Sequence, residues 1–271
     1  MATPTPETIA TRNQELLQCW DNFANDFRHY EKIMQQSWRP LLSHMDLGSA
    51  RSILEVGCGR GECAKAILGM APSGCSVVTS DFSSEMIKAA TAALEAHDAL
   101  PNPGREGQLR IEQMSALDLH SVPTASIDRY IANMLLHLVP DLDGMLRETR
   151  RVLDAKTGIA GFTIWGDRAQ SLVFSLRPGR EDSPNFDAGR DLDALARRIH
   201  AAGFSKVRMW RQPCIFELWD PERVVEFWMH SEGKTIQDTE WLQEARKRTT
   251  RAICDEGKPI GLEAVIILAM P

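Results

Sequence analysis

The sequence predicts an α/β fold, a parallel sheet covered by helices on both faces. Two observations predict it. Strand-like and helix-like segments alternate from residue 52 to residue 164, and the first strand runs into a glycine-rich turn. Parallel neighbours need a crossover connection, usually a helix, so this alternation is the pattern that a parallel sheet leaves in a sequence. The composition agrees, because 43% hydrophobic and 25% charged residues are typical of a folded globular chain.

The elements of the alternating part follow from their residue patterns. Strands are expected at the apolar runs 52–56, 75–79, 109–113, 127–132 and 158–164. Helices are expected over 63–68, 85–97 and 142–153. Ahead of them, Leu16, Trp20, Phe23, Phe27 and Tyr30 recur at steps of three and four, which predicts one face of a single helix. The Pro40 region and a short loop should separate this helix from the first strand.

The later part of the chain adds two more strand regions and a helical insertion. A helix over 191–202 should end at Gly203, a glycine suited to a helix C-terminus. Strands are expected at 204–210 and 214–218, and a final strand at 264–269. Between them, Asp220 before Pro221 indicates the start of a helix, and a second helix is expected over 238–254.

Charge and composition exclude several functional classes. The chain has 271 residues with 31 Lys and Arg against 37 Asp and Glu, a net charge of −6, which argues against a protein that binds nucleic-acid phosphates over a wide surface. No apolar stretch approaches the roughly 18 residues of a membrane span, and we see no secretory signal at the start. Six scattered cysteines then indicate free thiols in a reducing compartment, so we expect a cytoplasmic protein.

The chemistry is expected at the turn after the first strand. Gly57, Gly59 and Gly61 allow the backbone to approach a ligand closely, and Asp81 ends the next strand, where a carboxylate can accept both hydroxyls of a ribose. Two nucleotide-type interpretations compete. A dinucleotide fingerprint would place the third glycine one residue later. In the other interpretation, the acid Glu55 before the turn holds a ligand ammonium group through a water molecule or an adjacent backbone group.

These segments resemble a known family. Residues 53–62 (ILEVGCGRGE) are similar to the first motif of class I S-adenosylmethionine-dependent methyltransferases, and 80–87 (SDFSSEMI) to their ribose-binding loop. Residues 115–119 (SALDL) fall where the family places its adenine loop, and 127–137 (IDRYIANMLLH) resemble its fourth strand and the turn after it. Residues 151–153 and 157–158 resemble the turn before strand five. The resemblance covers about residues 50–167 and is specific for fold and cofactor, not for substrate.

The resemblance implies a Rossmann-like sheet of seven strands, mostly parallel with an antiparallel last strand. It implies S-adenosyl-L-methionine as cofactor and S-adenosyl-L-homocysteine as product. The cofactor-binding residues carried over from it are Glu55, Gly57, Cys58, Gly59, Gly61, Asp81, Phe82, Met86, Ser115, Ala116, Leu117 and Asn133. The family commonly has Asp where Ser115 stands, so adenine contact is expected to rest on backbone at 116–117 and on Phe82, with Asp118 as a substitute acid.

Two residues are candidates for the reaction itself. His137, just past strand four, is expected beside the methyl acceptor, and the competing interpretation is a hydrogen-bonded histidine that shapes the pocket floor. Tyr30 is expected to close over the methionine end of the cofactor, and its competing interpretation is part of the apolar helix face. No metal is expected, because Cys58 and Cys63 lack a second Cys/His pair nearby and the turn at Ala132 and Asn133 offers no acids.

We therefore expect cap helices at 1–48 and a methyltransferase domain at 49–271, with a helical insertion at about 219–256. The tryptophans at 165, 219, 228 and 241 predict an apolar lid, or else packing of the insertion onto the sheet. The expected acceptor is a small molecule methylated at O or N. The alternatives are an RNA or protein methyltransferase, and a cofactor-binding partner subunit without turnover. The basic run 246–251 is interpreted as a solvated helix face, and the expected state is a monomer or homodimer without membrane contact.

Overall fold

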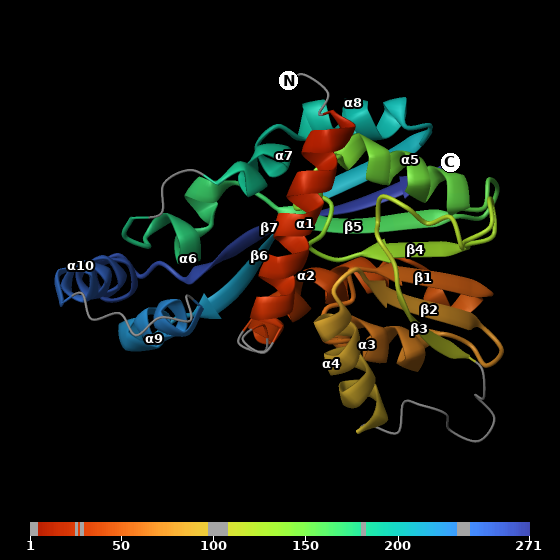
Figure 1. The fold of residues 1–271 in the computed structure, drawn as a ribbon. Coiled ribbons are helices and arrows are strands. Elements are labelled where there is room, and N and C mark those ends of the chain that lie inside the picture. The colour runs from red at the N-terminus through yellow and green to blue at the C-terminus, as the bar shows by residue number, and fades with distance from the viewer. Residues whose placement is uncertain (1–4, 25–26, 28–29, 97–107, 180–182, 232–238) are drawn as a thin grey trace.

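A single twisted sheet of seven strands forms the centre of the molecule (Figure 1). The computed structural model describes residues 5–24, 27, 30–96, 108–179, 183–231 and 239–271, with the side chains of 230 and 231 left out. The predicted helix ends at His97 and Asp238 lie outside the described residues. The strands are β1 (Ser52–Val56), β2 (Ser76–Asp81), β3 (Leu109–Gln113), β4 (Arg129–Ala132), β5 (Ile159–Trp165), β6 (Lys206–Glu217) and β7 (Ile260–Met270).

The strand order is β3-β2-β1-β4-β5-β7-β6. Each neighbouring pair from β3 to β5 is parallel, and β7 is antiparallel both to β5 and to β6. The prediction of a mostly parallel sheet with an antiparallel last strand is confirmed. Strand β1 pairs with β2 on one side and β4 on the other, so the chain order reverses there. In open α/β sheets a ligand crevice forms beyond the strand ends at such a reversal.

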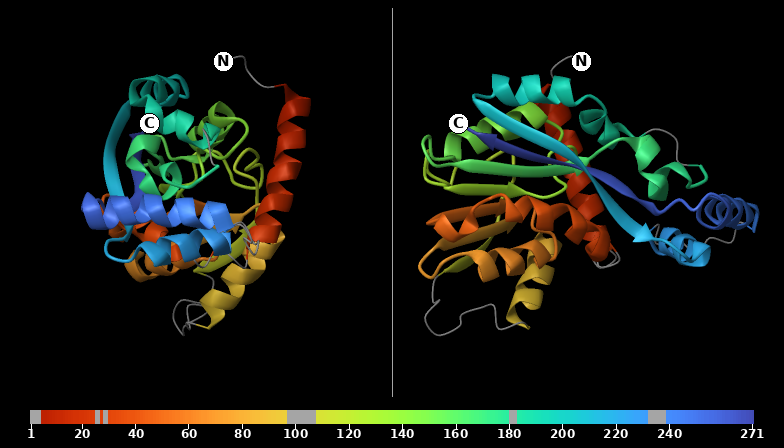
Figure 2. Two further views of the ribbon diagram at one scale, coloured as in Figure 1. Left: turned by 90° about the vertical axis from the view of Figure 1, so that its left-hand side faces the viewer. Right: turned by 180° about the vertical axis from the view of Figure 1, so that it is seen from behind.

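Helices cover both faces of the sheet, as predicted, and each face has its own hydrophobic core (Figure 2). One face packs against α5 and α8, and the other against α2, α3 and α4. The helices are α1 (Pro6–Phe23), α2 (Glu31–Ser43), α3 (Glu62–Met70), α4 (Ser84–Glu95), α5 (Leu142–Val152), α6 (Leu172–Ser175), α7 (Asp187–Arg190), α8 (Leu192–Ala201), α9 (Pro221–Ser231) and α10 (Thr239–Thr250). Shorter 3₁₀ or π turns are η2 (Leu47–Ser49), η3 (Arg168–Gln170), η4 (Pro184–Phe186) and η5 (Arg251–Asp255).

The sequence signals for the later helices hold in the structure. Asp220 accepts a hydrogen bond from the Glu222 backbone N–H at 2.9 Å, so it caps α9 as expected. Gly203 follows α8 with a φ of +98°, the left-handed conformation that favours glycine after a helix. The two strands expected at 204–210 and 214–218 are one continuous strand, β6, which passes through Pro213. Proline is tolerated there because β6 is the last strand of the sheet.

Two expectations for the N-terminal region are wrong. Pro40 lies inside α2 rather than in a loop. It sits near the last turn, where a proline removes one backbone hydrogen bond, and the buried Leu41 and Leu42 continue the helix against the core. The predicted single aromatic helix is two helices, because α1 ends at Phe23. The Arg60 guanidinium donates to the Ala24 carbonyl oxygen at 3.1 Å and occupies that acceptor at the break.

A third hydrophobic cluster lies beyond the end of the sheet, around α9 and α10. These helices stand on the long β6–β7 ribbon, away from the two main layers (Figures 1 and 2). Ile33 of α2 joins this cluster, whereas Trp38, Leu41 and Leu42 of α2 belong to the sheet core. Helix α2 thus packs as part of the domain, while α1 has no buried side chain among its described residues.

Candidate active site

The glycine turn after β1 brings backbone to the edge of a deep cavity. Gly57, Gly59 and Gly61 have φ values of +74°, +54° and +84°, all left-handed. A Cβ atom on Gly57 would come within 2.8 Å of the Leu135 side chain, and one on Gly59 within 3.3 Å of Phe27. The absence of side chains here therefore opens space that an alanine would fill. Gly61 precedes the first residue of α3, so the backbone N–H groups of the first helical turn begin at this cavity.

Asp81, at the end of β2, is held against the glycine turn. One of its carboxylate oxygens accepts from the Gly59 N–H at 3.0 Å and the other from the Ser83 N–H at 3.0 Å. Burial raises the pKa of Asp81 to about 6, although these backbone hydrogen bonds oppose the shift. The two backbone hydrogen bonds fix the orientation of the carboxylate on the cavity wall. Each carboxylate oxygen can still accept a further hydrogen bond from a ligand.

Glu55 lies below the same turn and is 1% exposed. Its carboxylate accepts a hydrogen bond from the Thr79 hydroxyl, and the Cys63 thiol also donates to it. Burial raises the pKa of Glu55, so a nearby cation would favour its ionised form. Glu55 lines the cavity, as a group expected to hold an ammonium must.

The predicted adenine loop lies on the same wall. Ser115, Ala116 and Leu117 line the cavity together with Phe82 and Met86. Ser115 accepts a hydrogen bond from the Leu117 N–H at 3.2 Å, which tightens the loop. The expectation that Asp118 could replace the usual acid is wrong. Its carboxylate pairs with the exposed His120 at 3.0 Å and is not part of the cavity wall.

The turn after β4 carries a fixed amide. The side-chain oxygen of Asn133 accepts from the Ser37 hydroxyl at 2.9 Å and from the Thr163 hydroxyl at 2.6 Å. Because two hydroxyl groups donate to this oxygen, the amide NH₂ group must be the other branch of the side chain. Asn133 also lines the cavity. The next residue, Met134, has a φ of +52°, a left-handed conformation that costs a non-glycine residue roughly 1–2 kcal/mol. Its N–H donates to Thr163 at 2.8 Å, which helps to hold that conformation.

The two candidate catalytic residues have different places. Tyr30 lines the cavity; its ring stacks on Phe27 with centroids 6.1 Å apart and meets Phe227 edge-on at 4.7 Å. His137 does not line it. The His137 ring is buried against Trp165, with centroids 5.3 Å apart, and neither ring nitrogen has a hydrogen-bond partner among the described residues. Burial lowers the pKa of His137 to about 3, so the ring is neutral at pH 7 and a weak base. His137 is therefore not placed to contact an acceptor in the cavity, and within the described part of the chain it does not form the hydrogen bond of the competing interpretation.

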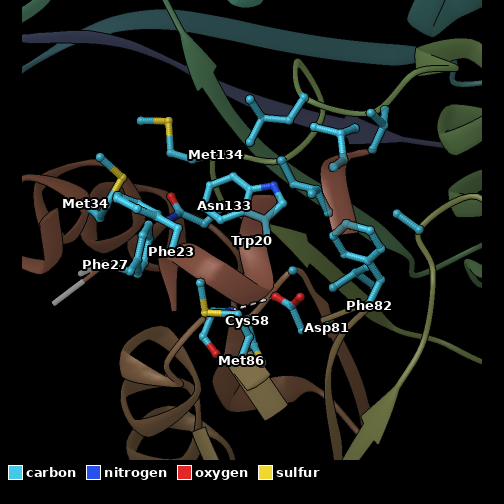
Figure 3. Close-up of a pocket in the computed structure, with 18 of the residues that line it drawn as sticks. Trp20, Phe23, Phe27, Met34, Cys58, Asp81, Phe82, Met86, Asn133 and Met134 are labelled. Carbon is cyan, nitrogen blue, oxygen red and sulfur yellow. Dashed lines mark hydrogen bonds between the residues drawn. The ribbon is translucent and has the colours of Figure 1, made fainter. Parts of the chain in front are cut away.

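An aromatic wall from α1, from Phe27 between the two helices and from the start of α2 covers the cavity over the glycine turn. Trp20, Phe23, Phe27 and Met34 come from this side, facing Cys58, Asp81 and Met86 across the space (Figure 3). Helix α1 runs across the direction of the strands (Figure 1) and is tied to the β2–α4 loop by a hydrogen bond from the Ser83 hydroxyl to Asp21. The cavity has a volume of about 430 Å³, within the usual range for small-molecule sites.

The opposite wall comes from a segment that the sequence patterns did not single out. It consists of Trp165, the last residue of β5, and of the described residues 166–179 and 183–186, which contain η3, α6 and η4. Its residues on the cavity wall are Trp165, Arg168, Phe174, Arg177, Ser183, Asn185 and Phe186. Only the position of Trp165 directly after a strand could have indicated this wall, because helices this short have no periodic pattern.

The tryptophans of the α9–α10 insertion do not line the cavity. Trp228 and Trp241 support the 165–186 segment from behind, donating indole N–H groups to the carbonyl oxygens of Val173 at 2.7 Å and Pro178 at 3.0 Å. Trp219 is 82% exposed. Trp228 and Trp241 therefore pack the insertion against the rest of the domain, as the competing interpretation expected. The prediction that Trp219, Trp228 and Trp241 form an apolar lid is wrong, because none of the three lines the cavity.

The arginines of the basic run, in α10 and at the start of η5, form ion pairs on the surface. Arg246 forms an ion pair with Glu222 at 2.9 Å, Arg248 with Glu244 at 2.7 Å, and Arg251 with Glu256 at 2.7 Å. These pairs agree with the solvated-face interpretation.

Among the described residues there is no cluster of three or more His, Cys, Asp or Glu side chains that could hold a metal ion. No described helix is both long and apolar enough to cross a membrane.

Comparison with known proteins connects this geometry to a family. Residues 53–156 match the model of a methyltransferase domain, and this range carries the glycine turn, Asp81 and the loop at 115–117. The chain contains a class I S-adenosylmethionine-dependent methyltransferase domain. Residues 53–156 thus form a methyltransferase domain, with S-adenosylmethionine as its methyl donor. No curated protein sequence matches the chain.

Solved structures share the fold of this methyltransferase at low sequence identity. A chain in the complex of the Haloferax volcanii Trm112 methyltransferase activator with a protein described as a methyltransferase has a TM-score of 0.62 and 14% identity, covering 93% of this chain and 96% of its own. YcgJ from Bacillus subtilis has a TM-score of 0.56 and 18% identity, covering 86% and 97%. Haemonchus contortus phosphoethanolamine N-methyltransferase 2, in complex with phosphomonomethylethanolamine and S-adenosylhomocysteine, has a TM-score of 0.56 and 13% identity, covering 91% and 57%.

The residues present fit this donor. The left-handed glycines leave a cradle that Cβ atoms would fill, and Asp81 and Glu55 supply acceptors rather than donors beside it. Hydroxyl and ammonium groups need such acceptors. The wall opposite the acids carries apolar and sulfur-containing side chains, which suit the planar and aliphatic parts of a nucleoside cofactor.

Proposed function

We propose that the methyltransferase acts on a small, partly apolar acceptor and methylates it at an oxygen or nitrogen atom. The observation that carries this proposal is that the cavity has walls on two sides. Aromatic residues of α1, Phe27 and the start of α2 line one side of it, and Trp165, Phe174 and Phe186 line the other. The cavity of about 430 Å³ includes the glycine turn, so the cofactor and the acceptor would share it, and a space of this size suits small molecules. The Haemonchus contortus fold neighbour holds a small acceptor, phosphomonomethylethanolamine.

In this proposal the predicted residues keep their roles around the cofactor. Asp81 accepts from the ribose hydroxyls, and Glu55 stabilises the ammonium group. Phe82, Met86, Ser115, Ala116 and Leu117 enclose the adenine, while Gly57, Cys58, Gly59 and Gly61 form the cradle. Asn133 and Tyr30 lie on the cavity wall at the turn after β4 and at the start of α2, so we assign them to the methionine end.

Methyl transfer asks mainly for alignment and exclusion of water. When bound, S-adenosylmethionine would supply a methyl group activated for transfer to a lone pair of the acceptor, with the cofactor sulfur as the leaving group. The protein's part is to hold the acceptor in line with the methyl–sulfur bond, which can contribute several kcal/mol by restricting orientation. The Trp20, Phe23 and Phe27 wall excludes water from this space.

The described cavity wall holds no histidine, so we propose that the acceptor loses its proton to bulk water, before it enters the cavity or after methyl transfer, rather than to His137. A general base matters only where the acceptor must lose its proton before or during attack. The neutral, buried His137 ring instead supports Trp165 from the protein interior.

The experiment that tests the proposal follows a labelled methyl group. The protein is incubated with [methyl-¹⁴C]S-adenosylmethionine and a mixture of metabolites, total RNA and soluble protein, and the label is then separated by size and class. We expect label in the small-molecule fraction, and less of it with the Asp81→Ala variant when S-adenosylmethionine is below saturation. Label in RNA or protein would support the macromolecular alternative, and cofactor binding without any transfer would support a partner subunit.

Location, oligomeric state and partner class complete the proposal. A cytoplasmic location is supported by the six cysteines, all of which are free thiols, four of them buried. We propose a monomer or homodimer, to be checked by light scattering of the purified protein. Nucleic acid is not the expected partner, because the arginines of α10 already pair with acids.

A further inference from the structure

The buried carboxyl group of Glu55 is held by two donors from neighbouring elements. Glu55 of β1 is in register with Thr79 of the parallel strand β2, so their side chains lie side by side on one face of the sheet. The Thr79 hydroxyl donates to the Oε2 atom of Glu55. The Cys63 thiol, in the first turn of α3, donates to the same carboxylate. Two different elements thus hold this acid below the glycine turn.

Thr79 itself is not part of the cavity wall. It is fully buried, whereas its partner Glu55 lines the cavity. The hydroxyl of the next residue, Ser80, donates to the Glu55 carbonyl oxygen at 3.0 Å. Strand β2 therefore fixes both the backbone and the side chain of Glu55. Any influence of Thr79 on a bound cofactor must pass through the residues that it contacts.

The two donors also favour the ionised form of Glu55. Burial raises the pKa of Glu55, the hydrogen bonds from Thr79 and Cys63 lower it, and the Asp81 carboxylate raises it further. Burial raises the pKa of the Cys63 thiol well above its usual range, so this thiol keeps the proton that it donates.

The other neighbours of Glu55 supply no such donor. Cys58 of the glycine turn has a pKa that burial raises well above its usual range, so it stays a neutral thiol. On the β4 side, the residue in register with Glu55 is the apolar Ile131. Among these neighbours, the groups that favour a charged Glu55 are therefore Thr79 and Cys63.

We propose that Thr79, with Cys63 as the second donor, is a positioning residue that aims the Glu55 carboxylate at the ammonium group of the bound cofactor. The proposal rests on the role proposed for Glu55 and names the residues on which that role depends. A buried carboxylate that loses a donor takes up a proton at higher pH. The protonated acid presents an O–H group where the ammonium group needs an acceptor.

The test compares two ligands that differ at the end assigned to Glu55. 5′-Methylthioadenosine shares the adenosine and the thioether of S-adenosylhomocysteine and lacks its ammonium and carboxylate groups. Calorimetry between pH 5 and pH 8 gives the preference for S-adenosylhomocysteine, the ratio of the two affinities. Titration of Asp81, whose pKa is about 6, cancels in this ratio because both ligands carry the ribose.

The decisive variant is Thr79→Val, which removes the hydroxyl and keeps the shape of the side chain. It should lower the preference about tenfold at pH 6, the usual effect of a hydrogen bond to a charged group. The loss should shrink toward pH 8, where Glu55 ionises in both proteins. Thr79→Ser keeps a hydroxyl and should restore the preference. In a Glu55→Gln background, Thr79→Val should change the preference no further, because the two residues act as one unit.

Thr249→Val is the matched control. Thr249 is equally buried, its hydroxyl donates to the Ala245 carbonyl oxygen at 2.9 Å, and it does not line the cavity. This variant should keep the wild-type preference at every pH. Cys63→Ala tests the second donor and serves if Thr79→Val does not fold; it should lower the preference in the same direction.

Two results would overturn the proposal. One is an equal loss of affinity for both ligands at every pH in Thr79→Val, which would show that Thr79 only packs the sheet. The other is an unchanged preference in both Thr79→Val and Cys63→Ala. A different result would refute the role of Glu55 itself, namely equal affinity of the wild type for the two ligands. Absence of binding of either ligand to the wild type would refute the cofactor site.

Discussion

At the scale of single residues, the site contains groups with a shifted pKa or an unfavourable backbone conformation. Asp81 and Glu55 are carboxyl groups with pKa values raised by burial, and Met134 adopts a left-handed backbone conformation. Each of these costs free energy in the unliganded protein. A ligand that offers hydroxyl and ammonium groups to the two acids would recover part of that cost. The unliganded protein therefore gives up stability at the positions assigned to the cofactor.

The pH dependence of stability should show the burial of Asp81. Its pKa is about 6 in the folded protein against an ordinary value of 3.8, so between these pH values the native state holds a proton that the unfolded chain has released. Stability contributed by the protonated form is therefore lost as pH rises through this window, by roughly 3 kcal/mol in total. Denaturation by urea from pH 4 to pH 7 should show this loss in the wild type and not in Asp81→Asn. The same change in unfolding free energy with pH in the wild type and in Asp81→Asn would contradict the assignment of the raised pKa to Asp81.

The glycine turn allows a sharper comparison. Gly57→Ala should reduce stability by roughly 1–2 kcal/mol, the cost of a left-handed non-glycine residue, and should also weaken S-adenosylhomocysteine binding. The second effect is expected because the new Cβ would meet Leu135 at 2.8 Å at the cavity.

Gly74→Ala is the matched control for this change. Gly74 has a φ of +87°, and no described heavy atom lies within 4 Å of the position that a Cβ would take there. The control should share the loss of stability, seen in urea denaturation, and keep its affinity in calorimetry. Equal affinity losses in both variants would show that the turn acts through strain alone.

At the scale of elements, α1 and the insertion support the cavity in different ways. The insertion is a packed unit with its own hydrophobic cluster. Helix α1 has no buried side chain among its described residues and faces the cavity with Trp20 and Phe23. Helices with few buried contacts open at low free-energy cost. We therefore expect α1 to be the part of the cavity wall that admits the substrates.

Hydrogen exchange tests this role of α1. Asp21→Ala removes the carboxylate that binds the Ser83 hydroxyl, a contact of about 0.5–1.5 kcal/mol. Amide exchange over α1 should speed up by up to about tenfold, while exchange in the sheet stays unchanged. Saturating S-adenosylhomocysteine should slow α1 exchange in the wild type. Asp143→Ala, which removes a surface partner of Arg198, serves as the control. Unaltered α1 exchange in Asp21→Ala would contradict the assignment.

At the scale of the whole molecule, the sequence predicts the cofactor half much better than the acceptor half. The alternation of strands and helices, the glycines and Asp81 are local signals with fixed spacing, and the sheet confirms the fold that they predict. The division at residues 48 and 49 stays a proposal, and α2 packs into the sheet core rather than only capping it.

The acceptor half depends on tertiary contacts that have no sequence period. The wall at 165–186 is made of short turns, and its position is set by Trp228 and Trp241, some fifty to sixty residues away in the chain. For the same reason His137 could not be placed from sequence, because whether a residue after β4 faces the cavity or the interior depends on the left-handed turn at Met134. Asn133 and Tyr30 do lie on the cavity wall, and their roles remain predictions.

Binding of the cofactor through Asp81 is best tested by calorimetric titration of S-adenosylhomocysteine into the wild-type protein and Asp81→Ala. We expect binding to the wild type, and a loss of roughly 1.5–3 kcal/mol in the variant, the usual value of hydrogen bonds to a charged group. That loss corresponds to a dissociation constant about 10 to 150 times larger. Absence of binding to the wild type at millimolar ligand, or unchanged affinity in a folded Asp81→Ala, would contradict the assignment of this cavity to the cofactor.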